Sequence, residues 1–76
     1  MTVPSIHLSP ERSLRQVFAA PAACSGGIIR RDVRDVERLI GREVFEAELR
    51  RRGFRAVENA GQYVIFCNAE RLRLIE

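Results

Sequence analysis

The 76-residue chain has no lysine, one histidine and two cysteines, and its apolar runs are short. All 13 basic residues are therefore arginine, and with 10 acidic residues they give a net charge of +3. Because acidic residues are interleaved with the arginines, this charge is weak support for a polyanionic partner. An arginine-only basic set also results from GC-rich coding, so the absence of lysine alone indicates no function.

The residues that most often carry out chemistry are too few to form a recognisable site. Cys24 and Cys67 do not have the spacing of metal ligands, and neither has an evident base beside it for nucleophilic catalysis. His7, the single histidine, is expected to be solvated. Gly26-Gly27 is too short to be a phosphate-binding loop. We therefore expect no catalytic residues, no metal site and no cofactor.

Residues 1–25 contain all three prolines, and their apolar run from Val17 to Cys24 is interrupted by Pro21. This pattern is neither a signal peptide nor a membrane span, so we expect a cytoplasmic protein with no membrane partner. In that compartment the two cysteines should be thiols, with a single disulfide as the alternative.

The same segment allows two structural interpretations. Ser9 and Pro10 have the residue types of an N-cap and first position for a short helix reaching about Ala20. The segment lacks a sustained apolar period, however, so the preferred prediction is a flexible arm over residues 1–25 followed by one small domain over 26–76.

Helical patterning begins at Asp32, which has the residue type of an N-cap. Val44, Phe45 and Leu49 then lie on one side of a second helical stretch, which Gly53 should end in a left-handed conformation. Gly41 stands where the apolar face changes. We predict two helices, at about 32–40 and 43–52, or one helix kinked at Gly41.

From Phe54 the apolar period changes to two, which predicts a β-hairpin. Asn59-Ala60-Gly61 offers a three-residue loop with Gly61 at the positive-φ position, and this loop pairs Glu58 with Gln62. The resulting register assigns two apolar faces, one with Phe54, Ala56, Val64 and Phe66, and the other with Val57, Tyr63, Ile65 and Cys67.

A third strand is expected at Leu72 to Ile75, after a turn at Asn68 to Arg71. It would add Leu72 and Leu74 to one face of the hairpin. Since the predicted helices can cover only the opposite face, we expect self-association of the chain as a dimer. The residues of this predicted contact are Val57, Tyr63, Ile65, Leu72 and Leu74. Tyr63 and Phe66 would be base-stacking platforms if exposed, although strand aromatics more often lie in a core.

Arginines cluster at the end of the second predicted helix. This corner contains Arg50, Arg51, Arg52 and Arg55, with Arg30 and Arg31 as candidate neighbours. Such a cluster can hold phosphate or nucleic acid. The competing interpretation is that Arg50 to Arg52 pair with Glu46 and Glu48 on the helix surface.

The stretch from the second helix to the last strand, residues 43–75, resembles the HicA messenger-RNA interferases. That resemblance implies a double-stranded-RNA-binding-like fold. The family's catalytic histidine follows the hairpin glycine, whereas here Gly61 is followed by Gln62 and Tyr63, so ribonuclease activity is not implied.

Other segments resemble a group of short bacterial proteins, some labelled phosphoribosylanthranilate isomerase. That label implies a barrel of roughly 200 residues or more, which a chain of this length cannot form, so no catalytic residue is carried over. The matching segments are Gly26-Gly27-Ile28-Ile29-Arg30-Arg31, Val36-Glu37-Arg38, Gly41-Arg42, Arg51-Arg52-Gly53-Phe54 and Gln62-Tyr63-Val64-Ile65-Phe66-Cys67-Asn68.

We predict an α+β fold in which two short helices pack on a three-stranded antiparallel meander, with a short additional strand near Ile28 as an option. A non-enzymatic homo-oligomeric interaction module is the favoured function. An RNA- or DNA-binding module that uses the arginine corner is the first alternative, and a small enzyme is the second.

Overall fold

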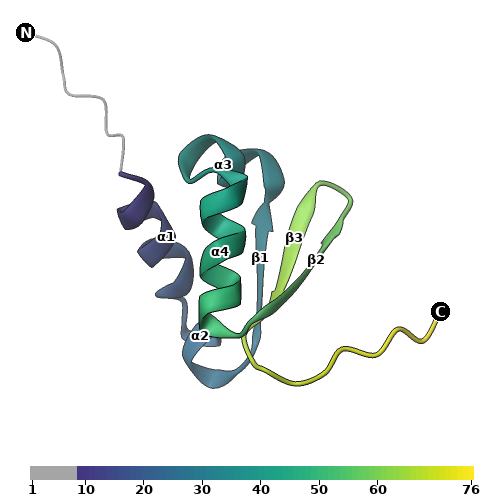
Figure 1. Ribbon diagram of the computed structural model, residues 1–76. Coiled ribbons are helices and arrows are strands. Elements are labelled where there is room, and N and C mark those ends of the chain that lie inside the picture. Colours follow the sequence, from purple (N-terminus) through teal and green to yellow (C-terminus); the bar gives the residue numbers. More distant parts are fainter. Residues whose placement is uncertain (1–8) are drawn as a thin grey trace, which may run out of the picture.

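The computed structural model describes residues 9–76 and has the α+β architecture expected from the sequence. Helices form one layer and a three-stranded antiparallel sheet forms the other, while the C-terminal residues extend away from both (Figure 1). The elements in chain order are α1 (Pro10–Phe18), α2 (Pro21–Ser25), β1 (Ile28–Asp32), α3 (Val33–Leu39), α4 (Arg42–Arg52), β2 (Arg55–Asn59) and β3 (Gln62–Phe66).

Helix α1 begins as the Ser9-Pro10 pair suggests. The Ser9 hydroxyl accepts a hydrogen bond from the Arg12 amide at 3.2 Å, and Pro10 occupies the first turn, where its missing N–H costs nothing. The helix buries Val17 and Phe18 in the core. The preferred prediction of a flexible arm is therefore corrected for residues 9–25, because two apolar side chains anchor α1 to the domain. Residues 1–8, including His7, lie outside the described part of the chain.

Two separate helices, α3 and α4, follow β1 as predicted. Asp32 caps α3, because its carboxylate accepts hydrogen bonds from the amides of Arg34 at 2.8 Å and Asp35 at 3.4 Å. Gly41, at φ 99°, separates the helices, and Gly53, at φ 73°, ends α4 in the left-handed conformation. Both glycines occupy backbone conformations that other residues rarely adopt.

The sheet has the strand order β1-β3-β2, so the third strand comes from Ile28–Asp32. We predicted the third strand at Leu72 to Ile75, and that assignment is wrong: the segment forms no regular structure in its own chain. Strand β1 occupies the edge of β3 that is not paired with β2, and the backbone amide of Cys67 extends this pairing by donating a hydrogen bond to the Gly27 carbonyl at 2.9 Å.

The hairpin register also differs from the prediction, by one residue. Asn59 pairs with Gln62, which leaves a two-residue turn at Ala60 (φ 53°) and Gly61 (φ 76°). Two successive positive φ angles are typical of a type I′ turn, whose twist matches that of the flanking strands. The shift pairs Val57 with Val64 and moves Tyr63 and Ile65 to the opposite face from Val57.

The core lies between the helices and this second face. Phe45 and Ile65 are fully buried, and the Tyr63 ring packs against Phe45 with a centroid separation of 4.9 Å. The ring of Phe18, from α1, also packs in this cluster, with centroid separations of 6.2 Å from Phe45 and 5.8 Å from Phe54. Aromatic pairs at these separations stabilise a core beyond their area burial. Every helix that contributes to the core therefore covers the same face of the sheet.

Candidate interaction surface

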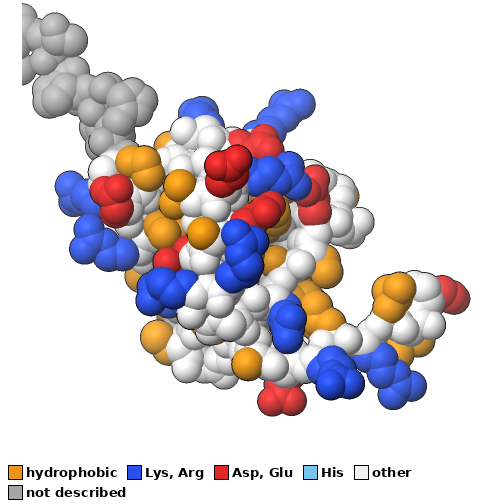
Figure 2. Space-filling model, in the orientation of Figure 1, with side chains coloured by type: hydrophobic (Ala, Val, Ile, Leu, Met, Phe, Trp, Pro, Cys, Tyr) orange, Lys and Arg blue, Asp and Glu red, His pale blue; other side chains and the backbone are white. Residues whose placement is uncertain are grey.

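The sheet face turned away from the helices is apolar along its central strand. Val64 and Phe66 of β3 alternate with the buried Tyr63 and Ile65, and both are half-buried. Their cross-strand neighbours Ile28 and Val57 are 53% and 44% exposed. We call Ile28, Val57, Val64 and Phe66 the open face. Hydrophobic side chains beside the strands and along the C-terminal tail are visible at the surface in Figure 2.

Two arginines flank the open face. Arg30 is the β1 neighbour of Val64, and Arg55 is the β2 neighbour of Phe66, so the two lie on opposite edges of the sheet. Both side chains are exposed, and neither makes an ion pair with any residue from 9 to 76. The open face therefore combines an apolar centre with positive edges.

The C-terminal tail, residues 69–76, leaves the sheet at the same end as Ile28 and Phe66. Its apolar side chains lie largely in solvent, since Leu72, Leu74 and Ile75 are 43%, 89% and 81% exposed. The tail extends away from the domain in Figure 1. Alternation of Leu72 and Leu74 with Arg71 and Arg73 is typical of a strand, yet this segment pairs with no strand among residues 9–76.

The predicted self-association residues are divided by this arrangement. Tyr63 and Ile65 are 4% and 0% exposed and belong to the core, so their assignment to an exposed contact is corrected. Val57 lies on the open face, and Leu72 and Leu74 lie on the tail. The error follows from the loop, because a shift of one residue exchanges the faces of a strand. Val64 and Phe66, which we assigned to the covered face, replace the two core residues on the open one.

At the end of α4, the predicted arginine corner is partly neutralised. Glu48 pairs with Arg51 and with Arg52, whose Nε atoms lie 2.9 and 2.6 Å from its carboxylate oxygens. The pKa of Glu48 is lowered below its ordinary value, mainly by the hydrogen bonds from Arg51 and further by the hydrogen bond from Arg52. Burial of the carboxyl group acts in the opposite direction but does not outweigh them. The Arg52 guanidinium also lies 4.4 Å from the centre of the Phe18 ring. These ion pairs of Arg51 and Arg52 with Glu48 agree with the interpretation that the arginines pair with acidic residues on the helix surface.

The remaining members of the corner do not converge. Arg50 is exposed on α4, and Arg55 points to the open face. Arg30 and Arg31 are adjacent on β1, so their side chains lie on opposite faces of the sheet. The structure therefore separates the six predicted phosphate-binding arginines: two are ion-paired at the end of α4, Arg50 is exposed on α4, two lie on the open face and one lies on the helix side of the sheet.

The sequence pattern did not single out Arg42, which is the most connected charged group described. Its guanidinium donates to Glu58 at 2.7 Å, Glu46 at 3.1 Å and Glu37 at 3.2 Å, and it lies 5.9 Å from the centre of the Tyr63 ring. Only the Glu46 partner, four residues along α4, was visible in the sequence. Arg42 ties α3, α4 and β2 together.

Burial disfavours ionisation of the cysteine and tyrosine side chains on the covered side of the sheet. Cys67 is buried, and burial raises the pKa of its thiol, so the reactive thiolate is disfavoured. Burial likewise raises the pKa of Tyr63. Both cysteines are free thiols. Within residues 9–76, no cluster of histidine, cysteine or acidic side chains is suited to hold a metal ion, and no helix has the length and hydropathy to span a bilayer.

No protein-family model, curated protein or solved structure matches the chain. The resemblances to the HicA interferases and to the short bacterial group stay predictions. At the position of the interferase histidine, the structure places the exposed Gln62 at the start of β3.

Proposed function

We propose that the chain is a cytoplasmic, non-enzymatic interaction module that forms a homodimer through its open face. The observation that carries this proposal is the one-sided helix layer, which leaves Ile28, Val57, Val64 and Phe66 without a covering helix or strand from the described residues 9–76. Contiguous apolar patches on a soluble domain mark sites of association. A domain of this size also gains stability from oligomerisation, because its own core is small.

The distribution of charge suits a two-fold contact. In a symmetric interface each copy offers the same patch, so an apolar centre must meet an apolar centre. Arg30 and Arg55 lie at the two edges of the sheet, where they would remain in the hydrated rim of the interface. The apolar tail gives a second contribution, since Leu74 of one copy is free to pack on the other.

Sedimentation velocity over a concentration series tests this function. The wild type should form a dimer, and Val57→Glu should remain a folded monomer because a carboxylate would enter the apolar contact. Val44→Glu is the matched control: Val44 is 48% exposed against 44% for Val57, but it lies on α4 and away from the open face.

Leu74→Glu examines the tail separately and should weaken the dimer without changing the domain, since Leu74 is 89% exposed. A wild type that is monomeric throughout the series would contradict the homodimer. Equal effects of Val57→Glu and Val44→Glu would place the contact elsewhere.

A second candidate function is binding of single-stranded nucleic acid on the same face. It is favoured by Phe66, a half-buried aromatic side chain flanked by Arg55 and close to Arg30. Aromatic side chains on an open sheet stack on bases while arginines hold the phosphates. This arrangement replaces the helix-end corner as the candidate surface.

Fluorescence anisotropy with labelled single-stranded RNA in a salt series separates the two functions. Replacing Arg30 and Arg55 together by glutamine should reduce the slope of log affinity against log salt by roughly 1.4, about 0.7 for each phosphate contact. Arg34→Gln, which changes an exposed arginine on α3, should leave the slope unchanged. Binding by monomers with this pattern would select the nucleic-acid function, and absence of binding at low salt would remove it.

A further inference from the structure

Strand β2 is an outer strand of the sheet, because the strand order is β1-β3-β2 (Figure 1). The Cys67 amide donates toward β1, so alternation along β3 directs the backbone groups of Val64 toward β2. Val57, the partner of Val64, therefore uses its backbone groups inside the sheet. Those of Ala56 and Glu58 point outward, and no segment in the described part of the chain pairs with them. Such an unpaired edge is a template for another strand.

A groove of about 330 Å³ lies at this edge, between α4 and β2. Its lining includes the apolar residues Leu49, Phe54 and Ala56. Phe54 and Ala56 are only partly buried, although both pack against the core. The edge therefore combines free backbone donors and acceptors with a partly apolar groove, which suits a strand with an apolar side chain turned toward the helices.

The C-terminal tail matches this edge in one antiparallel register. That register pairs all five residues of β2, with Arg55 opposite Glu76, Ala56 opposite Ile75, Val57 opposite Leu74, Glu58 opposite Arg73, and Asn59 opposite Leu72. Two pairs of opposite charge and two apolar pairs thus form together, and both kinds stabilise neighbouring strands. Every shift by one or two residues would instead place a charged tail residue opposite Ala56 or Val57.

The tail cannot reach this register on its own chain. Phe66, at the end of β3, lies beside the start of β2, whereas Leu72 would lie beside Asn59 at the end of β2. The two positions are about 16 Å apart, from four residues along a strand and two strand spacings across the sheet. Asn68 is farther still, because its side-chain amide donates to the Gly26 carbonyl on the β1 side at 3.0 Å. Four residues from there span at most about 14 Å.

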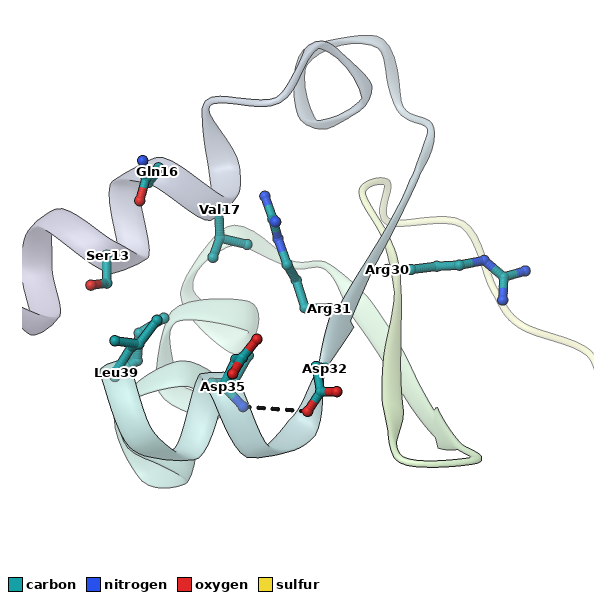
Figure 3. Close-up of a pocket in the computed structure, with 10 residues that line it drawn as sticks. Ser13, Gln16, Val17, Arg30, Arg31, Asp32, Asp35 and Leu39 are labelled. Atoms are coloured by element: carbon teal, nitrogen blue, oxygen red, sulfur yellow. Dashed lines mark hydrogen bonds between the residues drawn. The ribbon is translucent and has the colours of Figure 1, made fainter.

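The outer edge of β1 does not suit the same segment. Strand β1 shares a cavity of about 450 Å³ with α1 and α3, and in Figure 3 Arg31 extends toward α1 while Arg30 points away. An antiparallel tail that covered all of β1 would place Arg71 or Arg73 beside one of these arginines, and like charges directly opposite each other are destabilising. Charge therefore directs the tail to β2.

We propose that the tail of each copy adds as an antiparallel fourth strand to the free edge of β2 in a second copy, with Leu74 opposite Val57. Leu74 then extends the open face, and Ile75 enters the groove between α4 and β2. Two such exchanges, related by the two-fold axis, link the chains reciprocally. This strand exchange rests on the proposed homodimer and specifies how the apolar tail contributes to it.

Cysteine cross-linking tests the register. In a Cys24→Ser background, chains with Val57→Cys are mixed with chains that carry Leu74→Cys, and mass spectrometry follows the mixed disulfide during air oxidation. Val57 and Leu74 would form a non-hydrogen-bonded pair, whose Cα separation of about 4.5 Å suits a disulfide. The mixed disulfide should form at least about tenfold faster than with Val44→Cys in place of Val57→Cys. Val44 is the matched control, because it is exposed to a similar degree but lies on α4.

A charge exchange tests the outer ion pair in the full chain. Arg55→Glu and Glu76→Arg should each raise the dimer dissociation constant about threefold to tenfold, because the dimer contains this exposed pair twice. The double variant should recover most of the lost affinity. Arg30→Glu combined with Glu76→Arg is the control and should not recover it, since Arg30 lies on the same face but on β1. Sedimentation velocity measures all of these constants.

The outcomes separate strand exchange from dimer formation. A wild type that dimerises, without the mixed disulfide and without recovery in the charge exchange, would overturn strand exchange and leave the homodimer in place. A wild type that is monomeric at every concentration would contradict both. An intrachain disulfide in monomers that carry both Val57→Cys and Leu74→Cys would show that the tail pairs within its own chain, which also overturns the proposal.

Hydrogen exchange of the wild type gives a test that needs no substitution. The amides of Ala56 and Glu58 should exchange about tenfold more slowly in the dimer than in the monomer, because the added strand would accept their hydrogen bonds. The Val57 amide already donates within the sheet and should change less. Equal changes at all three amides would contradict an added strand at this edge.

Discussion

The two faces of the sheet are built from alternating residues of the same strands, yet their surroundings are opposite. On the covered face, Tyr63 packs against Phe45 of α4, and both Tyr63 and Ile65 are almost completely buried. On the open face, Val64 and Phe66 have comparable apolar character but remain half-buried. Hydrophobicity alone therefore does not decide which face becomes the core. The decision rests on register and on the side from which the helices approach.

The length of the hairpin turn determines which residues lie on each face. A three-residue loop at Asn59-Ala60-Gly61 would place Val57 and Tyr63 on the same face, whereas the two-residue turn separates them. The two-residue turn brings Tyr63 against Phe45 and the charged Glu58 within 2.7 Å of Arg42. Local turn chemistry and core packing thus favour the same register, which is the consistency expected of a foldable sequence.

The largest expected difference between the faces comes from neighbouring truncations in β3. Ile65→Ala should lower the free energy of unfolding by about 3 kcal/mol, because it leaves a cavity at a fully buried site. Val64→Ala, one residue away on the open face, should cost about 1 kcal/mol or less. Urea unfolding of the monomer at low concentration measures both. Similar losses would mean that something in the monomer also covers the open face.

Helix α1 covers part of the buried face of the sheet, and a second truncation tests this contribution. Phe18→Ala should lower the free energy of unfolding by about 3 kcal/mol, since the ring packs on Phe45 and Phe54 and lies beneath Arg52. Leu72→Ala, on the tail, is the contrasting variant and should change stability by less than about 0.5 kcal/mol. Thermal unfolding followed by circular dichroism compares them. A negligible effect of Phe18→Ala would restore the flexible-arm interpretation for residues 9–25.

A substitution in the turn tests the strand register that assigns residues to the two faces. Ala60 adopts φ 53°, which is unfavourable for a residue with an ordinary side chain. Ala60→Asn should therefore raise the free energy of unfolding by about 0.5–1 kcal/mol, because Asn-Gly suits a type I′ turn. Chemical denaturation measures the gain, and cross-strand amide contacts between Asn59 and Gln62 report the register. A loss of stability would indicate a different turn.

The smallest expected effect is a difference in alkaline pH response between the faces. Burial raises the pKa of Tyr63 above its ordinary 10.0 and that of Cys67 above its ordinary 9.0, and both residues belong to the covered side. As pH rises past these ordinary values, the unfolded chain releases protons that the folded chain retains, so the free energy of unfolding falls.

Tyr63→Phe should remove the part of this decline that sets in near pH 10. It should be neutral or slightly stabilising at pH 7, because the Tyr63 hydroxyl is buried without a partner among the described residues. Denaturant midpoints measured across alkaline pH compare this variant with Cys67→Ala and with the open-face variant Phe66→Leu. An unchanged decline in Tyr63→Phe would mean that Tyr63 titrates normally.

The sequence by itself determined the elements whose signals are local. An acidic N-cap at Asp32, the glycines at 41 and 53 and the apolar stripe of α4 predicted both central helices, because capping and periodicity act within a few residues. The fold class followed from the same signals. Ser9 and Pro10 also indicated α1, although the preferred prediction set it aside because it lacked a long apolar period.

Only the tertiary structure decided which segment completes the sheet, which face is covered and where the arginines meet their partners. Each of these depends on contacts between residues far apart in the chain. Ile28–Asp32 pairs with β3 residues that lie 30 to 38 positions later in the chain, and Arg42 joins Glu58 sixteen residues later. The cavity that contains Arg31 is likewise formed by three elements that are separate in sequence. Such distant juxtapositions have no local period, so they become visible only when packing selects one arrangement of the elements.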